Sequence, residues 1–546
     1  MNESTDGAGA PQTVPVVAGG ALDPFVGRNV AWLLRHRRDS HPERECLVWW
    51  PLDGVPKRWT YAQVVDEVEA TAGAMMDRGI APGDYVCIHM ENSPDFVFTW
   101  LAALLFGAVT VTTNTRSSVD ELTYFLDKSG AMAVITDEER LPVVKQALHR
   151  ATGVRLLVTA TDGPVLDQDV PEAVEVMTVR DLRSGPARPE LAYPRSGAAA
   201  GVQFTSGTTA RPKGVVWTQS NFLWGAKVSA AHQQMTGADR TLTYLPLFHT
   251  NAQIYCVMAT LWVGGAVVLL PRFSRRLFWP AATEERATFA SMIPFAVRAL
   301  LDDPVPDHHF RAWGNGLFVP RWDEYFGVST LTWWGMTETV SHPVISELGL
   351  PARQFAMGLP ATEYQVRIIG DDGRALDGEG QGLIEVLGMR GVSVALGYLD
   401  DEAANAAAWT ENGWLRTGDR VERHEDGWLS FVEREKDMLR VGAENVAAQE
   451  VERVVGAVRG VLEVAVVAGP DKMLDEVPVA FVLGTADAPD DLSQQIMERC
   501  RDRLADFKVP RAVFVVDELP RSTLEKVAKN RLREQAKELL GEGAEQ

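Results

Sequence analysis

Thr205 to Gly214, with the sequence T-S-G-T-T-A-R-P-K-G, is the stretch that decides the fold of this chain. It lies between two short apolar runs, V-Q-F at residues 202–204 and V-V-W at residues 215–217, which predict β-strands. Small residues let backbone N–H groups approach a polyphosphate, hydroxyls donate hydrogen bonds to its oxygens, and a lysine neutralises its charge. The stretch therefore predicts a phosphate loop, although its spacing differs from that of the common G-x-x-x-x-G-K-[ST] loop.

The residues of this loop that we expect at the phosphates are Thr205, Ser206, Gly207, Thr208, Thr209 and Lys213. Taken alone, a Ser/Thr/Gly/Pro cluster between strands is also typical of a solvent-exposed loop. The immediate return to an apolar strand and the unusual order of residue types favour the nucleotide interpretation.

The length and charge of the chain limit its organisation and its partners. At 546 residues it is too long for one ordinary hydrophobic core, so we expect at least two domains. Its formal net charge of −21 argues against nucleic acid or an anionic membrane surface as a partner, because both require basic patches. An anionic substrate must therefore meet a local positive site.

The cysteines and the apolar runs bear on the compartment. Cys46, Cys87, Cys256 and Cys500 show neither metal-ligand nor paired spacing, which is typical of a reducing compartment, and we expect the protein in the cytoplasm. No apolar run reaches the roughly 18 residues of a membrane span, and the first residues lack the plan of a secretory signal.

Predicted helices and strands alternate along much of the chain, after residues 1–20, which predict a mobile tail. Helices are expected at residues 61–78, 93–105, 118–128, 138–149, 220–235 and 253–261, and strands at 85–89, 108–112, 131–136, 154–159, 241–245, 266–270 and 331–334. This order is typical of parallel sheets with helices on their faces. Ligands of such sheets bind beyond the carboxyl ends of the strands, so the loops that begin at Thr205, Pro246 and Gly335 are expected to share one pocket.

The last third of the chain has a different pattern. From Tyr364, short strands with turns predict a small β-barrel or curled sheet, and a renewed alternation after residue 436 predicts a lid with its own α+β fold. The predicted fold class is thus α/β, with a large N-terminal domain of stacked, mostly parallel sheets with helices plus the β-barrel, and a small mobile α+β C-terminal lid domain. The predicted domains are residues 21–435 and 436–546, with Lys436 as the hinge.

A second motif, W-G-M-T-E at residues 334–338, follows the predicted strand 331–334. A triphosphate needs a counter-ion, and magnesium is usually held by one carboxylate together with phosphate oxygens. This predicts Glu338 as a Mg²⁺ ligand. Taken alone, the motif is equally typical of a strand end followed by a helix cap.

Both motifs resemble those of the adenylate-forming superfamily, which contains acyl-CoA synthetases, the adenylation domains of peptide synthetases, and luciferases. Further blocks resemble it in the same order over nearly the whole chain, R-T-G-D at residues 416–419 and P-R-S-T-L-E-K-V at 520–527 among them. The resemblance implies ATP or AMP, Mg²⁺ and coenzyme A as cofactors and a small carboxylic acid or its adenylate as substrate. Nothing in the sequence favours the oxidation chemistry of the luciferases.

The resemblance also implies roles for single residues around AMP. Thr337 meets the α-phosphate, Asp419 accepts hydrogen bonds from the ribose hydroxyls, and Arg434 contacts ribose or phosphate. The adenine side is implied for Gly314, Asn315, Gly316, Trp333, Trp334 and Gly335. Core packing is the ordinary role of a tryptophan, and Trp333 and Trp217 are also large enough to shape an acyl pocket.

Two further residues carry catalytic expectations from the resemblance. His249, in P-L-F-H-T at residues 246–250, corresponds to a gate or wall of the acid pocket, although a lone histidine is more often structural. Lys526 corresponds to the catalytic lysine, because a cation between the α-phosphate and the attacking carboxylate stabilises the transition state. Lys529 is the alternative register, and a solvated charged cluster is the ordinary interpretation of both lysines.

The second half-reaction implied by the resemblance is thioesterification. The lid rotates about Lys436, removes Lys526, and brings residues 437–444, with Gly442 and Ala443, to the pocket that the pantetheine of coenzyme A enters. No fused carrier domain with a phosphopantetheine serine is recognisable, so free coenzyme A is the expected acceptor. A homodimer is compatible with the sequence, which does not determine the oligomeric state.

Three positions depart from the family pattern, which has glycine where this chain has Ala210, Ala443 and Glu525. An alanine that needs positive φ costs on the order of 1 kcal/mol, and a carboxylate beside Lys526 competes for its charge. These departures raise the alternative that the chain performs only thioesterification, with an adenylate supplied by a separate adenylating enzyme. A non-catalytic AMP-binding scaffold is the alternative of another class; the retained Lys213, Glu338, Asp419, Arg434 and Lys526 speak against it.

Overall fold

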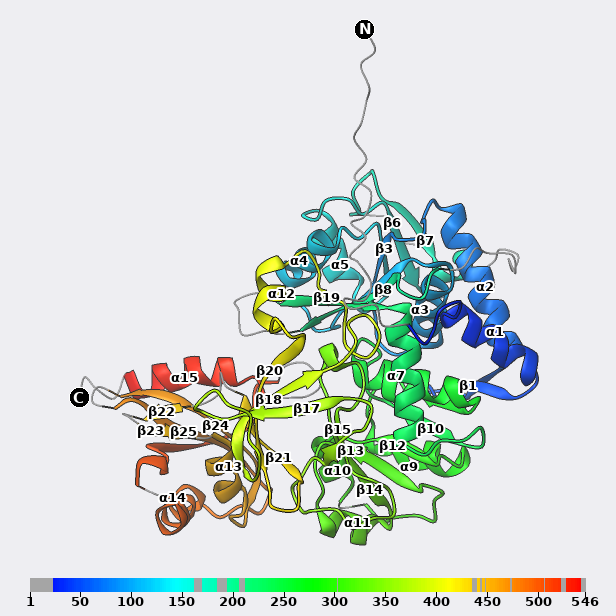
Figure 1. Ribbon diagram of the computed structural model, residues 1–546. Helices are drawn as coiled ribbons and strands as arrows, with labels where there is room; N and C mark the ends of the chain where they lie inside the picture. The colour runs from blue at the N-terminus through cyan, green and yellow to red at the C-terminus, as the bar shows by residue number, and fades with distance from the viewer. Residues whose placement is uncertain are drawn as a thin grey trace. The chain divides into compact units, whose positions relative to one another are not determined.

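The structure is a computed structural model that describes residues 23–161, 169–183, 194–205, 212–301, 303–434, 439–441, 444–446, 448–471, 474–504, 506–521 and 527–541. Contacts divide the chain into two compact units (Figure 1). The first contains Met1–Gln365 and Leu387–Trp414, and the second contains Val366–Val386 and Leu415–Gln546. Each unit is described by itself.

An eight-stranded sheet of the first unit has the order β19-β9-β8-β4-β3-β5-β6-β7. The strands from β8 to β7 in this order are parallel, whereas β9 is antiparallel to β8 and β19 is antiparallel to β9. The strands are β3 (Tyr85–His89), β4 (Val109–Thr112), β5 (Ala133–Asp137), β6 (Leu156–Ala160), β7 (Glu175–Thr178), β8 (Ala199–Thr205), β9 (Lys213–Thr218) and β19 (Gly397–Tyr398).

A nine-stranded sheet of the same unit has the order β16-β15-β14-β13-β12-β10-β11-β1-β2. Its central strands, from β14 to β1, are parallel, and the strands at both ends are antiparallel to their neighbours. The strands are β1 (Glu45–Trp49), β2 (Lys57–Thr60), β10 (Arg240–Thr243), β11 (Ala266–Leu269), β12 (Phe289–Ser291), β13 (Ala312–Asn315), β14 (Ser329–Trp334), β15 (Val344–Ile345) and β16 (Leu359–Pro360).

Helices join these two sheets into one core. The helix α2 (Tyr61–Asp77) contacts β1 and β2, α3 (Pro94–Phe106) contacts β3 and β4, and the two helices pack on each other. Every residue of α3 from Phe96 onward is buried, which explains why its sequence is apolar on all sides. Thr60 caps α2 in a capping box with Gln63.

A second group of helices lies next to the strands that carry the predicted motifs. The helix α7 (Gln219–His232) contacts β9 and η1 (Asn251–Met258), and η1 contacts β10 and β12. The remaining helices of the unit are α1 (Val30–Ser40), α4 (Val119–Ser129), α5 (Leu141–Leu148), α6 (Val179–Leu182), α8 (Ala259–Val263), α9 (Arg275–Glu284), α10 (Pro294–Leu300), α11 (Pro320–Phe326), α12 (Glu402–Ala408) and the short η2 (Thr337–Thr339).

The second unit contains two sheets. The strands β17 (Gln365–Ile369), β18 (Gly380–Leu387), β20 (Trp414–Arg423) and β21 (Leu429–Arg434) form one, and β22 (Leu439–Val441), β23 (Glu444–Val446), β24 (Val461–Asp471), β25 (Asp475–Gly484) and β26 (Ala512–Val516) form the other. The helices are α13 (Ala448–Gly456), α14 (Leu492–Arg503), α15 (Lys529–Gly541) and the short η4 (Asp506–Lys508). The contacts thus group the first of these sheets with the C-terminal segment, and the hinge predicted at Lys436 lies outside the described residues.

One predicted helix has a different form in the structure. Residues 253–261 were expected as a single regular helix, but residues 251–258 form the π-helix η1, and a regular helix continues only as α8. Residues 252–258 are all buried, so the hydrophobic pattern does not distinguish a π-helix from a regular helix here. Among the described residues, no helix combines the length and the apolar composition that a membrane crossing requires.

Candidate active site

The predicted phosphate loop joins β8 to β9. Thr205 is the last residue of β8 and pairs with Lys213, the first residue of β9, and both side chains are half-buried. Ser206, Gly207, Thr208, Thr209 and the departure Ala210 lie outside the described residues. The two strands therefore bring the first and the last expected phosphate ligands side by side at one end of the eight-stranded sheet.

Lys213 and Glu338 both contact Tyr398. The Tyr398 hydroxyl donates to Glu338 Oε1 at 2.8 Å, and Lys213 Nζ lies 5.1 Å from the centre of the Tyr398 ring. Glu338 is only 5% exposed, and burial together with this carboxylate raises the pKa of Tyr398 well above its usual value, so the hydroxyl stays a donor. One aromatic side chain thus holds the predicted metal ligand and faces the predicted phosphate lysine.

Sequence reasoning missed Tyr398. It lies on β19, which pairs with β9 through Tyr398 and Val215, far away in the sequence. A two-residue strand gives almost no periodicity, so only the observed pairing reveals that this tyrosine reaches the site.

The W-G-M-T-E motif leaves the end of β14 and is held at two backbone carbonyls. Trp217 Nε1 donates to the Thr337 carbonyl at 2.9 Å, and the Ala395 N–H donates to the Glu338 carbonyl at 2.8 Å. Trp217 is fully buried, so its role is to support this turn from within the core. The motif that leaves the nine-stranded sheet is thereby fixed to the sheet that carries the phosphate loop.

A buried amide network reaches the Thr337 side chain. The Thr250 hydroxyl lies 3.3 Å from Thr337 Oγ1 and donates to Gln203 Oε1 at 2.9 Å. Gln203 Nε2 donates to Gln253 Oε1 at 2.9 Å, and Gln253 Nε2 donates to the Leu247 carbonyl at 2.7 Å. Because Gln203 and Gln253 are 4% and 1% exposed, breaking this chain leaves buried polar atoms unsatisfied, so the network holds Thr337 in place.

A strained turn follows the motif directly. Val340 has φ +63° and ψ −47°, and the Ser341 N–H donates to the Thr339 carbonyl at 2.6 Å, which makes a classic γ-turn. A fully buried β-branched residue in this conformation is an outlier whose cost is of order 1–3 kcal/mol. Such strain concentrates at functional sites, and here it reverses the chain three residues after Thr337.

His249 lies in the loop between β10 and η1. Its ring centre is 4.5 Å from that of Phe248, its side chain is half-buried, and its carbonyl accepts from the Gln253 N–H at 3.0 Å. The π-helix begins two residues later, and π-helical turns are frequent at functional sites. His249 and Thr337 are thus connected through Thr250, which is adjacent to His249 and contacts Thr337.

Gly314 on β13 makes room for Trp333 on β14. A Cβ at Gly314 would lie 1.6 Å from the Trp333 ring, and Trp333 is 6% exposed. Directly after Gly314, Asn315 is the buried last residue of β13, and Gly316 is exposed. The contact gives Gly314 a packing role in addition to the predicted adenine role, and it makes Trp333 part of a buried wall.

Gly335 is closely packed by its neighbours, and Trp334 is buried. A Cβ at Gly335 would lie 2.6 Å from the Ser341 carbonyl oxygen and 2.8 Å from the Tyr255 hydroxyl. No larger residue fits at position 335 without moving the backbone of the γ-turn. The glycine of this motif is therefore required by close packing, whatever binds in front of it.

Two predicted ribose residues belong to the second unit. Asp419 on β20 pairs with Arg434 on β21, and Asp419 is 2% exposed, with its N–H donating to Thr417 Oγ1 at 3.1 Å. Gly442, Ala443, Glu525 and Lys526 lie outside the described residues. Lys529, the alternative to Lys526, is described, and its ammonium lies 2.7 Å from Glu452 Oε1.

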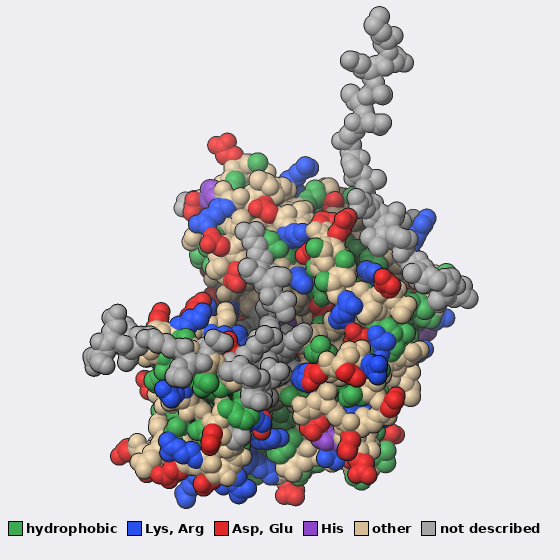
Figure 2. All heavy atoms as spheres, turned by 60° about the vertical axis from the view of Figure 1, so that its left-hand side comes forward, with side chains coloured by type: hydrophobic (Ala, Val, Ile, Leu, Met, Phe, Trp, Pro, Cys, Tyr) green, Lys and Arg blue, Asp and Glu red, His purple; other side chains and the backbone are tan. Residues whose placement is uncertain are grey.

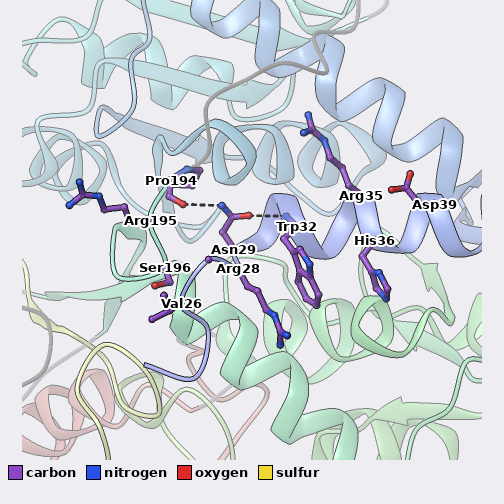
Figure 3. Close-up of a pocket in the computed structure, with 11 residues that line it drawn as sticks. Val26, Arg28, Asn29, Trp32, Arg35, His36, Asp39, Pro194, Arg195 and Ser196 are labelled. Carbon is purple, nitrogen blue, oxygen red and sulfur yellow. Dashed lines mark hydrogen bonds between the residues drawn. The ribbon is translucent and has the colours of Figure 1, made fainter. Parts of the chain in front are cut away.

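A cavity of about 690 Å³ lies elsewhere, at the start of α1 (Figure 3). Asn29 bridges its walls, because Nδ2 donates to the Pro194 carbonyl at 2.9 Å and Oδ1 accepts from the Trp32 N–H at 2.8 Å. Arg28 lies 5.0 Å from the Trp32 ring. None of the predicted catalytic or AMP-binding residues lines this cavity.

The surface charges are mixed, and the cysteines are unpaired, as their spacing predicts. Acidic and basic side chains are interspersed on the face drawn in Figure 2. All four cysteines are free and buried, and burial raises the pKa of Cys87 and of Cys256 to about 12, which keeps these thiols protonated and unreactive.

Two family models match this chain. The model for AMP-binding enzymes matches residues 34–399, and the model for the C-terminal domain of AMP-binding enzymes matches residues 450–526. A crotonobetaine/carnitine–CoA ligase of Citrobacter koseri is 30% identical over 524 residues, which cover 94% of this chain and 100% of that protein. The ligase of the same name from Salmonella paratyphi A is 29% identical over 526 residues, with the same coverage.

Solved structures share the fold. The O-succinylbenzoate coenzyme A synthetase of Bacillus subtilis, solved with AMP, has a TM-score of 0.78 and 27% identity, and the match covers 92% of this chain and 98% of that one. An anthranilate CoA ligase solved with anthranoyl-AMP has a TM-score of 0.84 over 95% of this chain and 98% of that one, at 24% identity. These likenesses confirm the predicted α/β fold class.

Proposed function

The chain belongs to the AMP-binding enzyme family, and from this premise we propose that it is an ATP-dependent carboxylate–CoA ligase that works in two half-reactions. It is an acid-thiol ligase, as its CoA-ligase relatives are, and it uses ATP or AMP and coenzyme A. The observation that supports the proposal is that Lys213 lies 5.1 Å from the ring of Tyr398, whose hydroxyl donates to the buried Glu338.

Lys213 and Thr337 serve the phosphates of ATP in this proposal. Lys213 neutralises charge at the start of β9, and Thr337 donates its hydroxyl to the α-phosphate from a turn that Trp217 and Thr250 hold in place. Asp419 and Arg434 serve the ribose. Preorganised donors of this kind stabilise charge as it develops without reorganising during the reaction.

Glu338 fits a magnesium ligand. Glu338 is 5% exposed and is oriented by the hydrogen bond that it accepts from Tyr398, and magnesium is usually bound by one or two carboxylates together with phosphate oxygens. Bound there, Mg²⁺ would neutralise charge on the phosphates. Glu338 would orient the metal-bound triphosphate, and Tyr398 would keep Glu338 from turning toward Lys213.

The first half-reaction forms an acyl adenylate. A carboxylate oxygen of the acid attacks the α-phosphorus, the P–O bond to pyrophosphate breaks, and pyrophosphate leaves. Lys526 stabilises the charge that gathers between the carboxylate and the α-phosphate, and His249 borders the acid. In the second half-reaction, after the lid has turned about Lys436, the thiolate of coenzyme A attacks the acyl carbon and AMP leaves.

The alternative function is thioesterification alone. Ala210 and Glu525 both fall on the adenylation half-reaction, since one stands in the phosphate loop and the other beside Lys526. In that case a separate enzyme supplies the acyl adenylate as a partner.

For either function we propose a cytoplasmic protein, since four free and buried thiols suit a reducing compartment. We also propose a homodimer as the assembly to test by a size measurement.

Acid-dependent exchange of labelled pyrophosphate into ATP tests the first half-reaction, and conversion of synthetic acyl adenylates to CoA thioesters tests the second. The acids include crotonobetaine, carnitine, anthranilate and O-succinylbenzoate, which the names of the relatives and structural neighbours suggest. Exchange with any acid supports the two-step ligase. Thioester formation without exchange supports the alternative, and failure of both together with no AMP binding contradicts the ligase and the scaffold alike.

A further inference from the structure

A buried imidazole follows the W-G-M-T-E motif in the sequence. His342 follows the γ-turn at Val340 and is fully buried. The centre of its ring is 4.6 Å from that of Trp333, with an interplanar angle of 23°, and 4.0 Å from that of Tyr255. Two aromatic rings thus hold the imidazole in a fixed plane.

One nitrogen of this ring has no protein partner among the described residues. His342 Nε2 is buried and makes no hydrogen bond there. An unsatisfied buried nitrogen is costly, and native structures keep one only for a reason such as a ligand or a catalytic role. The nitrogen on the other side of the ring, Nδ1, has two neighbours, at 3.4 Å each: His232 Nδ1 and Ser341 Oγ.

Glu363 and His232 determine which nitrogen of His342 carries the proton. His232 Nε2 lies 3.0 Å from Glu363 Oε2, and an ionised carboxylate accepts only, so His232 Nε2 carries a hydrogen. In neutral His232 the Nδ1 atom is then an acceptor, and a hydrogen on His342 Nδ1 satisfies it. In that tautomer Nε2 of His342 is an acceptor.

The opposite tautomer of His342, with its hydrogen on Nε2, would leave Nδ1 as the acceptor. His342 itself stays neutral, because burial and the neighbouring His232 hold its pKa well below the usual value. The titratable groups that surround the pair are Glu363, Tyr255 from η1 and Tyr364, whose hydroxyl donates to the Thr339 carbonyl.

The elements that enclose His342 also carry the predicted site. Trp333 immediately precedes the W-G-M-T-E motif on β14, and Tyr255 lies on η1, which begins two residues after His249. His342 is four residues beyond Glu338 on the same segment. The imidazole with the orphaned nitrogen thus contacts both the strand that leads into the predicted phosphate motif and the helix that follows the predicted acid-bordering His249.

We propose that His342 is a specificity-determining residue, whose Nε2 accepts a hydrogen bond from a hydroxyl or N–H group on the acyl part of the acid while His232 is neutral. The Glu363–His232 pair sets this polarity from the side away from the acid. The substrate class is thus a polar-substituted acid rather than a plain alkyl or aryl acid. This inference rests on the proposed function, because the acid site is defined by it.

Matched pairs of acids test the hydrogen bond. The probes are 3-hydroxybutanoate with 3-methylbutanoate, 4-hydroxybenzoate with 4-methylbenzoate, and anthranilate with 2-methylbenzoate, each assayed by pyrophosphate exchange and by thioester formation from its synthetic adenylate. The wild-type protein is expected to favour the polar member of one pair by roughly 10- to 100-fold in kcat/KM. His342→Leu is expected to lose that preference chiefly through KM for the polar acid, whereas Tyr255→Phe, which keeps the ring beside His342, retains it.

The outcomes separate this inference from the proposed function. Activity on the acids with no polar preference in the wild-type protein, or with the same preference in His342→Leu, overturns the role of His342 and leaves the ligase intact. Absence of both activities for every acid contradicts the proposed function instead. In that case the polarity of His342 is still measurable without any acid.

Nitrogen NMR of ¹⁵N-histidine-labelled protein tests the polarity directly. The expected result is a neutral His342 with its hydrogen on Nδ1 and none on Nε2. A His342 with its hydrogen on Nε2 overturns the assignment.

Discussion

At the scale of single residues, the site depends on side chains that fix other side chains. Tyr398 orients Glu338. The side chains of Gln203 and Thr250 position Thr337, and Trp217 holds the Thr337 carbonyl. Each of these supporting groups is buried or half-buried, so its hydrogen bond is not replaced cheaply by water. Preorganisation of this kind predicts losses of activity without losses of fold.

Tyr398→Phe removes the hydrogen bond to Glu338 and keeps the ring beside Lys213. We expect pyrophosphate exchange to fall roughly 10- to 100-fold, as for a lost hydrogen bond to a charged group, and to need a higher Mg²⁺ concentration. Thioester formation from a ready-made adenylate should be unchanged. Tyr325→Phe, which removes the hydroxyl of a 44% exposed tyrosine, is the control, and equal exchange in both variants would contradict the role of Tyr398.

His89 gives a pH dependence of stability. Burial, aided by the Arg140 charge, lowers the pKa of His89 from its usual 6.5 to about 4. Between these values the unfolded chain binds a proton that the folded chain excludes, so this contribution to stability is lost as the pH falls, by about 1.4 kcal/mol per pH unit. In His89→Gln this pH-dependent loss in the free energy of unfolding should be absent.

Urea unfolding of the wild-type protein and His89→Gln at pH 7 and pH 5 measures the effect. The free energy of unfolding of the wild type relative to the variant should fall by about 2 kcal/mol between these values. His149→Gln, at a side chain that is 48% exposed, is the matched control. Parallel pH profiles of the wild-type protein and His89→Gln would refute the prediction.

At the scale of elements, the packing of α7 on η1 decides how close the π-helix comes to the site. A Cβ at Gly225 would lie 2.5 Å from Ile254 Cγ2 and 3.0 Å from Val340 Cγ1. One glycine in α7 thus leaves room for both η1 and the γ-turn. The two helices therefore pack tightly at η1, which begins two residues after the predicted acid-bordering His249.

Gly225→Ala should disturb this support. We expect a loss of roughly 1–3 kcal/mol in the free energy of unfolding, as for overpacking, with a larger KM for the acid. Gly456→Ala in α13 is the matched change, since the nearest atom to its new Cβ is 3.8 Å away, and it should be neutral or stabilising by up to about 1 kcal/mol. Equal effects of the two variants in urea unfolding would show that the close contact is unimportant.

Elements also show how much the sequence alone predicts. The alternating helices and strands around α2, α3 and β3 follow from hydrophobic periodicity, and the loops that begin at Pro246 and Gly335, expected to lie together, do meet through Thr250 and Thr337. The π-helix, the two-residue β19 and the γ-turn at Val340 were not predictable, because each depends on tertiary packing that leaves no local pattern. The residues next to His342, namely His232 and its partner Glu363, are likewise distant from one another in the sequence.

At the scale of the whole molecule, the proposed chemistry divides between an N-terminal site and a C-terminal lysine. Lys526→Ala should reduce pyrophosphate exchange by at least about 100-fold, as for loss of a group that stabilises transition-state charge, while thioester formation from an adenylate continues. Lys529→Ala is the control, because the Lys529 ammonium lies 2.7 Å from Glu452 and its loss should affect neither half-reaction. The reverse pattern would assign the catalytic role to Lys529.

The pairing of β19 with β9 has a consequence for biosynthesis. The strand β9 leaves the ribosome long before Gly397 and Tyr398, so a nascent chain presents the outer edge of β9 with its backbone groups unpaired until β19 arrives. Closing such a distant contact is slow in folding and leaves an edge on which growing chains can associate. Chains truncated before residue 397 should therefore be recovered as aggregates, and the tyrosine that completes the site also closes this edge.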